Sequence, residues 1–254
     1  MLKFRWLIFV TIVAVSKTTF ANLPETIKTV QPSIVGVGLY GKLNRPSARF
    51  LGTGFVVGNG QYVATNAHVI PELVPSDKKQ NLFVVVGKGR NPPTRRAEVI
   101  AIDEEHDLAL LKISGKPLTP LNIERREVYE GEKIAFTGYP IGSVLGYYPV
   151  THQGIISSIT PIVIPARTAK ELSIKQLKQL KNPYLVYQLD ATAYPGNSGS
   201  PLYLQDSGKV IGVINKVLVK STKESILSDP SAITYAIPIK YLLPLLESVR
   251  NKTN

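Results

Sequence analysis

Short strand-like segments account for most of this sequence and leave room for few helices. Six of them lie in the first half of the chain, near residues 33–40, 50–57, 61–65, 81–86, 97–102 and 108–113. Six more follow, near residues 132–138, 151–159, 184–190, 200–204, 209–217 and 232–237. A doubly wound α/β protein would need a helix after nearly every strand. The pattern therefore predicts an all-β fold of two six-stranded antiparallel barrels.

Helix signals are confined to three places. A short helical lead-in is expected at Leu23 to Gln31. A capping-box sequence at residues 168–171 is followed by leucines on one helical face, which predicts a helix at about 169–181 inserted in the second barrel. The chain closes with a predicted C-terminal helix at about 239–250, which Pro244 is expected to shorten or kink.

The first 21 residues have the composition of a secretory signal peptide. Lys3 and Arg5 precede an apolar run, and small residues favour cleavage after Ala21. The run is shorter than the roughly 20 residues that a membrane-spanning helix needs, although an uncleaved anchor is the alternative. We therefore expect an exported protein, periplasmic or secreted, with one barrel in residues 22–125 and the other in residues 126–254.

Composition narrows the class of protein further. The chain contains no cysteine, so its stability must come from its core. Removal of residues 1–21 leaves 27 basic and 18 acidic residues, a net charge of +9. Anionic surfaces would attract such a chain, but a solvated basic surface is the simpler interpretation. Aromatic and basic residues are not interleaved as specific nucleic-acid binding would require, so no nucleic-acid partner is expected.

The most distinctive polar segment is PGNSGSP at residues 195–201, between two strand-like runs. Gly196 and Gly199 permit dihedral angles that let backbone N–H groups point into one space beside Ser198. That is the geometry of an oxyanion hole. Taken alone, these residues favour an ordinary hairpin turn, because glycine, asparagine, serine and proline are common turn residues.

Two upstream residues favour the catalytic interpretation. A serine hydroxyl needs a base to take its proton and a third group to hold that base in the right tautomer. His68 follows a strand at the predicted rim of the first barrel, and Asp107 opens the last strand of that barrel. His106 and His152 are the other two histidines, and a surface or hydrogen-bonded role is the simpler interpretation of each.

Other chemistries find less support in the sequence. There are no cysteines, no paired histidines at ligand spacing and no carboxylates clustered in the pattern that a metal site requires, so neither a metal nor another cofactor is expected. A lipase-type nucleophile elbow would need glycine where Ser200 stands, and its triad would follow the opposite order.

In these motifs the sequence resembles the chymotrypsin-like serine proteases, and most closely the catalytic domain of the bacterial HtrA-type group. The resemblance implies that His68 is the general base, Asp107 its orienting acid and Ser198 the nucleophile. It also implies that the N–H groups of Gly196 and Ser198 are the donors of the oxyanion hole. The matching segments are Pro32-Ser33-Ile34-Val35, Gly52-Thr53-Gly54-Phe55, Thr65-Asn66-Ala67-His68-Val69, Asp107-Leu108-Ala109-Leu110-Leu111-Lys112, Gly138-Tyr139-Pro140-Ile141-Gly142, Gly154-Ile155-Ile156-Ser157, Asp190-Ala191, the Ser198 segment and Tyr235-Ala236-Ile237-Pro238.

The resemblance also places a specificity pocket, with Thr192, Ile214, Asn215 and Lys216 as wall residues. Thr192 and Ile214 would favour a small or aliphatic side chain before the scissile bond, whereas Lys216 could attract an acidic one. The sequence around Ser198 is similar to that of glutamyl endopeptidases, but the histidine with which those enzymes bind glutamate would fall at Ile214. That substitution argues against acid specificity.

Two functions follow from the sequence. The first is an exported serine endopeptidase that hydrolyses unfolded or exposed polypeptides, and the second is a silent or latent protease-fold scaffold of the cell envelope. HtrA-type proteases usually carry PDZ domains after the catalytic domain, whereas 56 residues follow Ser198 here, so no PDZ domain is expected. The basic helix expected at 169–181 either packs on the barrel or docks on an anionic surface or partner protein.

Overall fold

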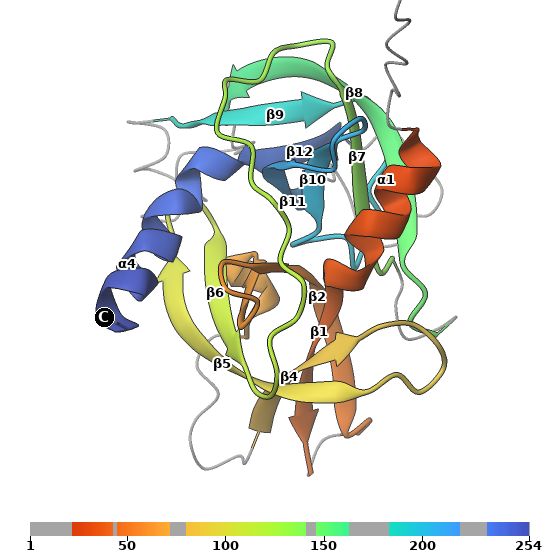
Figure 1. Cartoon of the computed structure of the whole chain (residues 1–254), viewed down its shortest axis with the longest axis vertical. Helices are drawn as coiled ribbons and strands as arrows, with labels where there is room; N and C mark the ends of the chain where they lie inside the picture. Colours follow the sequence, from red (N-terminus) through yellow and green to blue (C-terminus); the bar gives the residue numbers. More distant parts are fainter. Residues whose placement is uncertain are drawn as a thin grey trace, which may run out of the picture.

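The computed structural model describes residues 22–42, 45–71, 80–140, 146–162, 183–218 and 233–253. Its strands form two closed antiparallel barrels, stacked along the long axis of the molecule (Figure 1). The predicted signal peptide at 1–21 and the predicted helix at 169–181 lie outside the described residues. The prediction of two six-stranded barrels is confirmed.

The first barrel closes in the order β1-β2-β3-β6-β5-β4 and the second in the order β10-β11-β12-β9-β8-β7. The strands of the first barrel are β1 (Ile34–Gly41), β2 (Ala48–Val57), β3 (Tyr62–Thr65), β4 (Gln80–Val86), β5 (Thr94–Asp103) and β6 (Leu108–Ile113). Those of the second are β7 (Lys133–Gly138), β8 (Val150–Pro161), β9 (Leu185–Leu189), β10 (Pro201–Leu204), β11 (Val210–Leu218) and β12 (Ile233–Pro238).

Alternation along the strands divides the core into layers. Val35 and Leu111 belong to a buried cluster inside the first barrel. Their chain neighbours Ile34 and Leu110 belong to a second cluster that also contains Tyr203 of the other barrel. Because successive side chains of a strand point to opposite faces, one face fills the barrel and the other joins the two barrels. The two barrels therefore share a continuous apolar interface.

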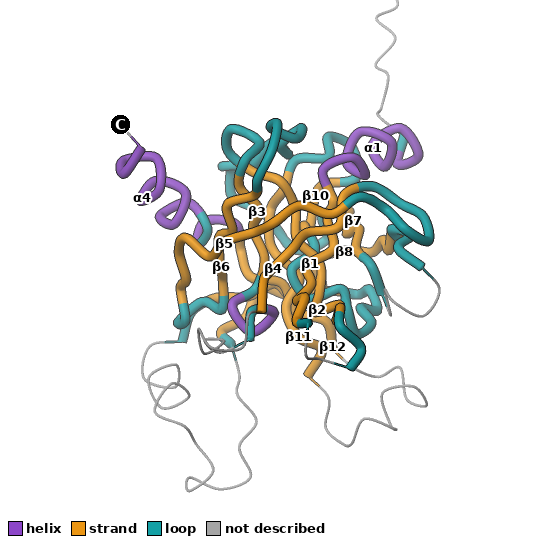
Figure 2. The backbone as a smooth tube through the Cα atoms, turned by 90° about the horizontal axis from the view of Figure 1, so that it is seen from below, coloured by secondary structure: helices purple, strands orange, loops and turns teal. Residues whose placement is uncertain are grey.

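Each end of the described chain packs on the barrel formed by the other half. Helix α1 (Leu23–Val30) contacts the second barrel, where the Thr26 hydroxyl donates to the carbonyl of Gln205 at 2.8 Å. Helix α4 (Leu243–Thr253) follows the second barrel and lies against β5 and β6 of the first. Figure 2 shows these two helices at opposite sides of the strands. The two predicted domains are thus fastened to each other by their terminal helices.

The lead-in helix and the C-terminal helix are both where they were predicted. A short 3-10 turn, η1 (Gln31–Ser33), links α1 to the first strand, and another, η5 (Ile239–Tyr241), precedes α4. Pro244 is the second residue of α4, where its missing N–H would have no partner in any case. It therefore shortens the predicted helix at its start and does not kink it. No helix within the described ranges is long and apolar enough to span a membrane.

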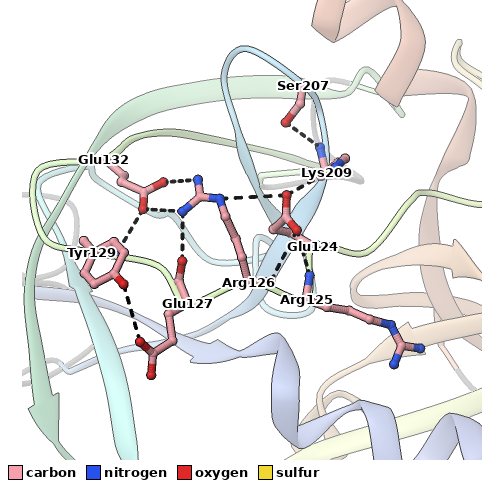
Figure 3. A network of polar contacts seen from close by, with 8 residues as sticks. All are labelled: Glu124, Arg125, Arg126, Glu127, Tyr129, Glu132, Ser207 and Lys209. Carbon is pink, nitrogen blue, oxygen red and sulfur yellow. Dashed lines mark hydrogen bonds and ion pairs between the residues drawn. The ribbon is translucent and has the colours of Figure 1, made fainter.

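The segment between β6 and β7, which connects the two barrels, is held in place by ion pairs (Figure 3). We call this segment the connector. The guanidinium of Arg126 donates to both carboxylate oxygens of Glu132, at 2.8 and 2.6 Å. This contact lowers the pKa of the Glu132 carboxyl below its usual value. Glu124 accepts hydrogen bonds from the Arg125 and Arg126 backbone and from Lys209. Since Arg126 is half exposed, we expect these pairs to orient the connector more than they stabilise the fold.

Candidate active site

His68 and Asp107 meet at one edge of the first barrel. His68 lies in a 3-10 turn, η2 (Ala67–Val69), directly after β3, and Asp107 directly precedes β6. Strands β3 and β6 pair antiparallel, so the end of one lies beside the start of the other. The Asp107 carboxylate accepts from the His68 ring Nδ1 at 2.6 Å and from the His68 backbone N–H at 2.9 Å. Because a carboxylate only accepts, Nδ1 carries the proton and Nε2 is left as an acceptor.

The backbone at Asp107 is fixed as firmly as its side chain. Its φ of 56° lies in the left-handed region, which aspartate tolerates better than most residues. Its carbonyl accepts from the Ala67 N–H and from the Asn66 side chain, both at 3.1 Å. The residues before His68 therefore hold the same aspartate that orients the His68 ring.

The segment around Ser198 leaves two N–H groups unengaged. Gly196 and Gly199 adopt φ values of 100° and 86°, which glycine reaches without strain. The N–H groups of Asn197, Gly199 and Ser200 donate to backbone carbonyls at 2.9–3.0 Å. Within the described chain, those of Gly196 and Ser198 have no acceptor. These are the two donors expected of an oxyanion hole.

Ser198 belongs to the second barrel but is held against the first. Its carbonyl accepts from the backbone N–H of Thr53 in β2 at 2.9 Å. Gly52 lies between that carbonyl and the side chain of Val69, the residue after His68. The hydroxyl of Ser198 makes no hydrogen bond within the described residues. In ligand-free proteases such contacts are often long and tighten on substrate binding.

The residues predicted for the specificity pocket differ in what they present. Thr192 and Asn215 are partly exposed. The side chain of Ile214 is fully buried in the core of the second barrel, where it packs with Ala193 and Ala236. It is therefore a packing residue in this conformation. The backbone of Lys216 lies in β11, and its side chain lies outside the described atoms.

A second aspartate–histidine pair lies beside the first. His106 Nδ1 is 2.7 Å from the carboxylate of Asp103, and its ring stacks on Tyr241 with a centroid separation of 4.1 Å. Tyr184 contacts the same ring edge-on. Burial, helped by the negative charges of Asp107 and Asp103, raises the pKa of the Tyr184 phenol. The imidazole of His106 is thus held in place by a carboxylate and two aromatic rings, and it is not the plain surface residue that the sequence suggested.

The sequence favoured a solvated or hydrogen-bonded His152, whereas the structure packs its ring against aromatic side chains. Its ring stacks on Phe136 at 4.9 Å and lies near Tyr194, the residue that leads into the Pro195–Gly196 turn. Burial lowers the pKa of His152 below its ordinary value. Its Nε2 is buried and has no partner among the described residues. The ring is therefore a neutral apolar contact in the second barrel.

Other sites on the described part of the chain offer less chemistry. No group of three or more histidines and carboxylates there could hold a metal ion. A cavity of about 350 Å³ lies beside the inter-barrel connector, and none of the three predicted triad residues lines it. Its walls include Arg125, Tyr129 and Leu185.

Sequence reasoning overlooked the importance of Thr53 and Gly138. Thr53 is fully buried and contacts the segment around Ser198 through both its backbone and its hydroxyl. A Cβ at Gly138 would collide with the hydroxyl of Ser200. The available signal was the threonine flanked by glycines at residues 52–54, because such glycines often mark close backbone approach.

Comparison with known proteins agrees with this geometry. The family model described as a trypsin-like peptidase domain matches residues 52–213. A probable periplasmic serine endoprotease DegP-like of Halomonas elongata is 29% identical over 204 residues, which is 80% of this chain and 36% of the relative. The serine protease Do-like HtrA of Bacillus subtilis is 28% identical over 250 residues, which is 91% of this chain and 49% of the relative. The chain thus spans between a third and a half of these curated relatives.

Solved structures show the same fold. The serine endoprotease from Yersinia pestis superposes with a TM-score of 0.62 at 23% identity, covering 90% of this chain and 66% of that one. An HtrA-type protease with a tripeptide gives a TM-score of 0.64 at 22% identity, covering 90% and 64%. The family match extends from β2, which holds Thr53, through the Ser198 segment to β11. On this basis, the chain belongs to the trypsin-like peptidase family.

Proposed function

We propose that this protein is an exported serine endopeptidase in which Ser198, His68 and Asp107 act together. One observation carries the proposal. The Asp107–His68 pair lies at the same edge of the barrel as a loop whose unengaged N–H groups are those of Gly196 and Ser198. Acyl transfer requires a base with a fixed tautomer and N–H groups that are free to bind the negative oxygen, and these residues offer both.

In the acylation step, the Ser198 oxygen attacks the carbonyl carbon of the substrate's peptide bond. His68 Nε2 takes the serine proton, and Asp107 stabilises the imidazolium that forms. The peptide C–N bond then breaks, and His68 returns the proton to the departing amine. The products of this step are an acyl ester on Ser198 and the free amino end of the cleaved polypeptide.

Deacylation repeats these transfers with water. His68 Nε2 takes a proton from water, whose oxygen attacks the ester carbonyl. The bond to Ser198 breaks, the serine oxygen regains a proton from His68, and a carboxylic acid leaves. In both steps the N–H groups of Gly196 and Ser198 would face the negative oxygen. Loss of one such donor typically lowers kcat by about 10² to 10³-fold.

The substrate we propose is unfolded or exposed polypeptide. The relatives that match this chain are named serine proteases and endoproteases. Thr192, a predicted wall residue of the specificity pocket, has a small and partly exposed side chain, and on this ground we propose a small or aliphatic side chain before the scissile bond. Cleavage profiling on a peptide library tests this preference, and a strong preference for arginine or lysine would contradict it.

Export is proposed on two grounds. Residues 1–21 have signal-peptide composition, and several relatives are named periplasmic. Expression of the full chain in a bacterial host, followed by N-terminal sequencing of the fractionated protein, tests this. We expect a mature chain that starts at Asn22 in the periplasm or medium. Recovery of the intact N-terminus in the membrane fraction would instead support an uncleaved anchor.

A fluorophosphonate probe tests the catalytic assignment directly, because it phosphonylates an activated serine. We expect mass spectrometry to find the label on Ser198 of the wild-type protein. The Ser198→Ala variant should remain folded and unlabelled, and it should not digest casein. The Ser157→Ala variant is a matched control, since Ser157 lies exposed on β8, and it should label normally.

The same experiment separates the enzyme from the scaffold alternative. A folded wild-type protein that neither labels nor digests casein would overturn the enzyme proposal and favour the silent or latent scaffold. Circular dichroism on each sample establishes that the protein is folded.

A further inference from the structure

Thr53 contacts the Ser198 loop at two alternate peptide groups. Its backbone N–H donates to the carbonyl of Ser198 at 2.9 Å, and its hydroxyl donates to the carbonyl of Gly196 at 2.7 Å. Thr53 belongs to the first barrel, and its side chain has no solvent exposure. A buried residue of one barrel therefore holds the loop that the other barrel contributes.

The direction of the Thr53 hydroxyl hydrogen bond is fixed by its partners. The hydroxyl oxygen accepts from the backbone N–H of Tyr139 at 3.0 Å. Since an N–H can only donate and a carbonyl can only accept, the hydroxyl hydrogen must point to Gly196. Threonine is also β-branched, which restricts its side-chain rotamer. The hydroxyl is thus a rigid connection from Tyr139, the residue after β7, to the Ser198 loop.

The peptide groups of the loop are constrained in turn. The peptide between Gly196 and Asn197 is held at both ends, by the Thr53 hydroxyl and by the Tyr194 carbonyl. The peptide between Ser198 and Gly199 is also held at both ends, by the Thr53 N–H and the Ile214 carbonyl. The unengaged N–H groups of Gly196 and Ser198 belong to the peptide groups that directly precede these two held peptides. The directions of these N–H groups therefore depend on the orientation of the held peptides.

The hydroxyl of Thr53 is the part of this arrangement that a substitution can remove selectively. Within the described chain it makes the one side-chain hydrogen bond to residues 195–200. Glycine at position 138 leaves the space, because a Cβ there would lie 2.9 Å from the Thr53 hydroxyl oxygen. The surrounding residues are thus shaped to admit this hydroxyl.

We propose that Thr53 is a positioning residue for the oxyanion hole: its hydroxyl holds the Gly196 carbonyl so that the N–H groups of Gly196 and Ser198 face the reacting carbonyl. This inference rests on the proposed peptidase function. Thr53 does not touch the substrate in this role. It acts through the peptide group of Gly196, so its removal should weaken transition-state stabilisation and leave substrate binding nearly unchanged.

The test compares Thr53→Val, which removes the hydroxyl at nearly constant shape, with Thr53→Ser, which keeps it. Steady-state kinetics on a peptide substrate should show kcat lowered by about 10- to 100-fold in Thr53→Val, with KM changed by less than about twofold. Thr53→Ser should keep kcat within about threefold of the wild type. Active sites are counted with the fluorophosphonate probe, so each kcat refers to folded, reactive protein.

A second measurement reports on the oxyanion hole itself. A peptide boronate forms a tetrahedral adduct with the serine, whereas a product peptide binds without one. The affinity of Thr53→Val for the boronate should fall in proportion to kcat, and its affinity for the product peptide should not. A residue that only stabilised the fold would not separate these two affinities.

Thr26→Val is the matched control. Thr26 is a buried threonine whose hydroxyl also donates to a carbonyl, that of Gln205, but it lies in α1. The Thr26→Val variant should have a lower Tm than the wild type and an unchanged kcat. If Thr53→Val does not fold, Thr53→Ala replaces it and should show the same loss of kcat.

The outcomes distinguish this inference from the function on which it rests. Wild-type turnover together with an inactive Ser198→Ala variant upholds the peptidase function. Given that result, a hydroxyl-free Thr53 variant with wild-type kcat, or with equal loss of boronate and product affinity, overturns the positioning role. An equal loss of kcat in Thr53→Ser would also overturn it. An inactive wild-type protein would overturn the function first.

Discussion

Asp107 binds His68 at two points, accepting from the ring Nδ1 at 2.6 Å and from the backbone N–H at 2.9 Å. One contact fixes the position of the ring's chain segment and the other fixes the orientation and tautomer of the ring. The left-handed backbone of Asp107, with φ of 56°, brings its side chain back toward η2. Both features depend on a residue with a short side chain that accepts hydrogen bonds and tolerates this conformation.

Replacing Asp107 with asparagine should leave the fold intact and lower kcat by roughly 10⁴-fold. Asparagine tolerates the left-handed region, and the carbonyl contacts of residue 107 are unchanged. Its amide would favour the wrong tautomer of His68. Steady-state kinetics measure the loss. Asp107→Ala is the companion variant, and it should lose a similar activity and also some stability, because alanine is strained at this φ.

Activity near that of the wild type in Asp107→Asn would show that another carboxylate orients His68. Asp103, which lies at the start of the same turn, is the first carboxylate to examine. The structure occupies Asp103 with His106, at 2.7 Å. A double variant, Asp103→Asn with Asp107→Asn, would therefore be expected to behave as the single Asp107 variant does.

Gly199→Ala should destabilise the protein by at least about 2 kcal/mol and reduce its activity, because φ is 86° and the new Cβ would collide with the carbonyl oxygen of Thr53. Gly131→Ala is a matched control. Gly131 also has φ of 86°, but no atom lies within 4 Å of its added Cβ. It should cost only about 1–2 kcal/mol and retain activity. Urea unfolding and kinetics on both variants test this, and equal losses would contradict it.

His152 should make stability fall as the solution is acidified. Burial lowers its pKa in the folded state below the ordinary value of 6.5. Near and below that pH the unfolded chain binds more protons at this position, so the free energy of unfolding decreases as pH falls. His152→Phe, which keeps the ring against Phe136, should show a smaller decrease between pH 7.5 and about pH 5. Urea unfolding at several pH values measures the difference, and parallel curves would rule out the effect.

Leu242 should be an important contact between the C-terminal helix and the rest of the protein. Its side chain is fully buried in the apolar cluster that joins the two barrels. Leu242→Ala should lower the free energy of unfolding by about 2–5 kcal/mol. The exposed neighbour Lys240 provides the control, since Lys240→Ala should change it by less than about 0.5 kcal/mol. A comparable loss in both variants would show that α4 does not dock as described.

Much of the fold was predictable because its signals are local. Runs of apolar, β-branched residues, such as Ile34-Val35, identify a strand from a few neighbours. Both faces of this strand proved to be buried. The edge position of His68 and Asp107 also followed from their places next to strands. The helix expected at 169–181 and the signal peptide remain predictions, because they lie outside the described residues.

Other features depend on contacts between distant segments, which local patterns do not encode. The stacking of the His106 ring on Tyr241 required the chain that follows the last strand of the second barrel to reach the first barrel. The burial of Ile214, which seemed to line a pocket, depends on which face of β11 turns inward.

The amino-acid sequence alone predicted the twelve strands, their division into two barrels and the order of His68, Asp107 and Ser198, because strand periodicity and turn chemistry act over a few residues. The contact between Thr53 and Gly196, which lie 143 residues apart, is known only from the folded structure, where the Thr53 hydroxyl holds the Gly196 carbonyl. The physical reason is that barrel closure and register bring these two segments together, and a single side chain's hydrogen-bond partner is fixed only once they meet.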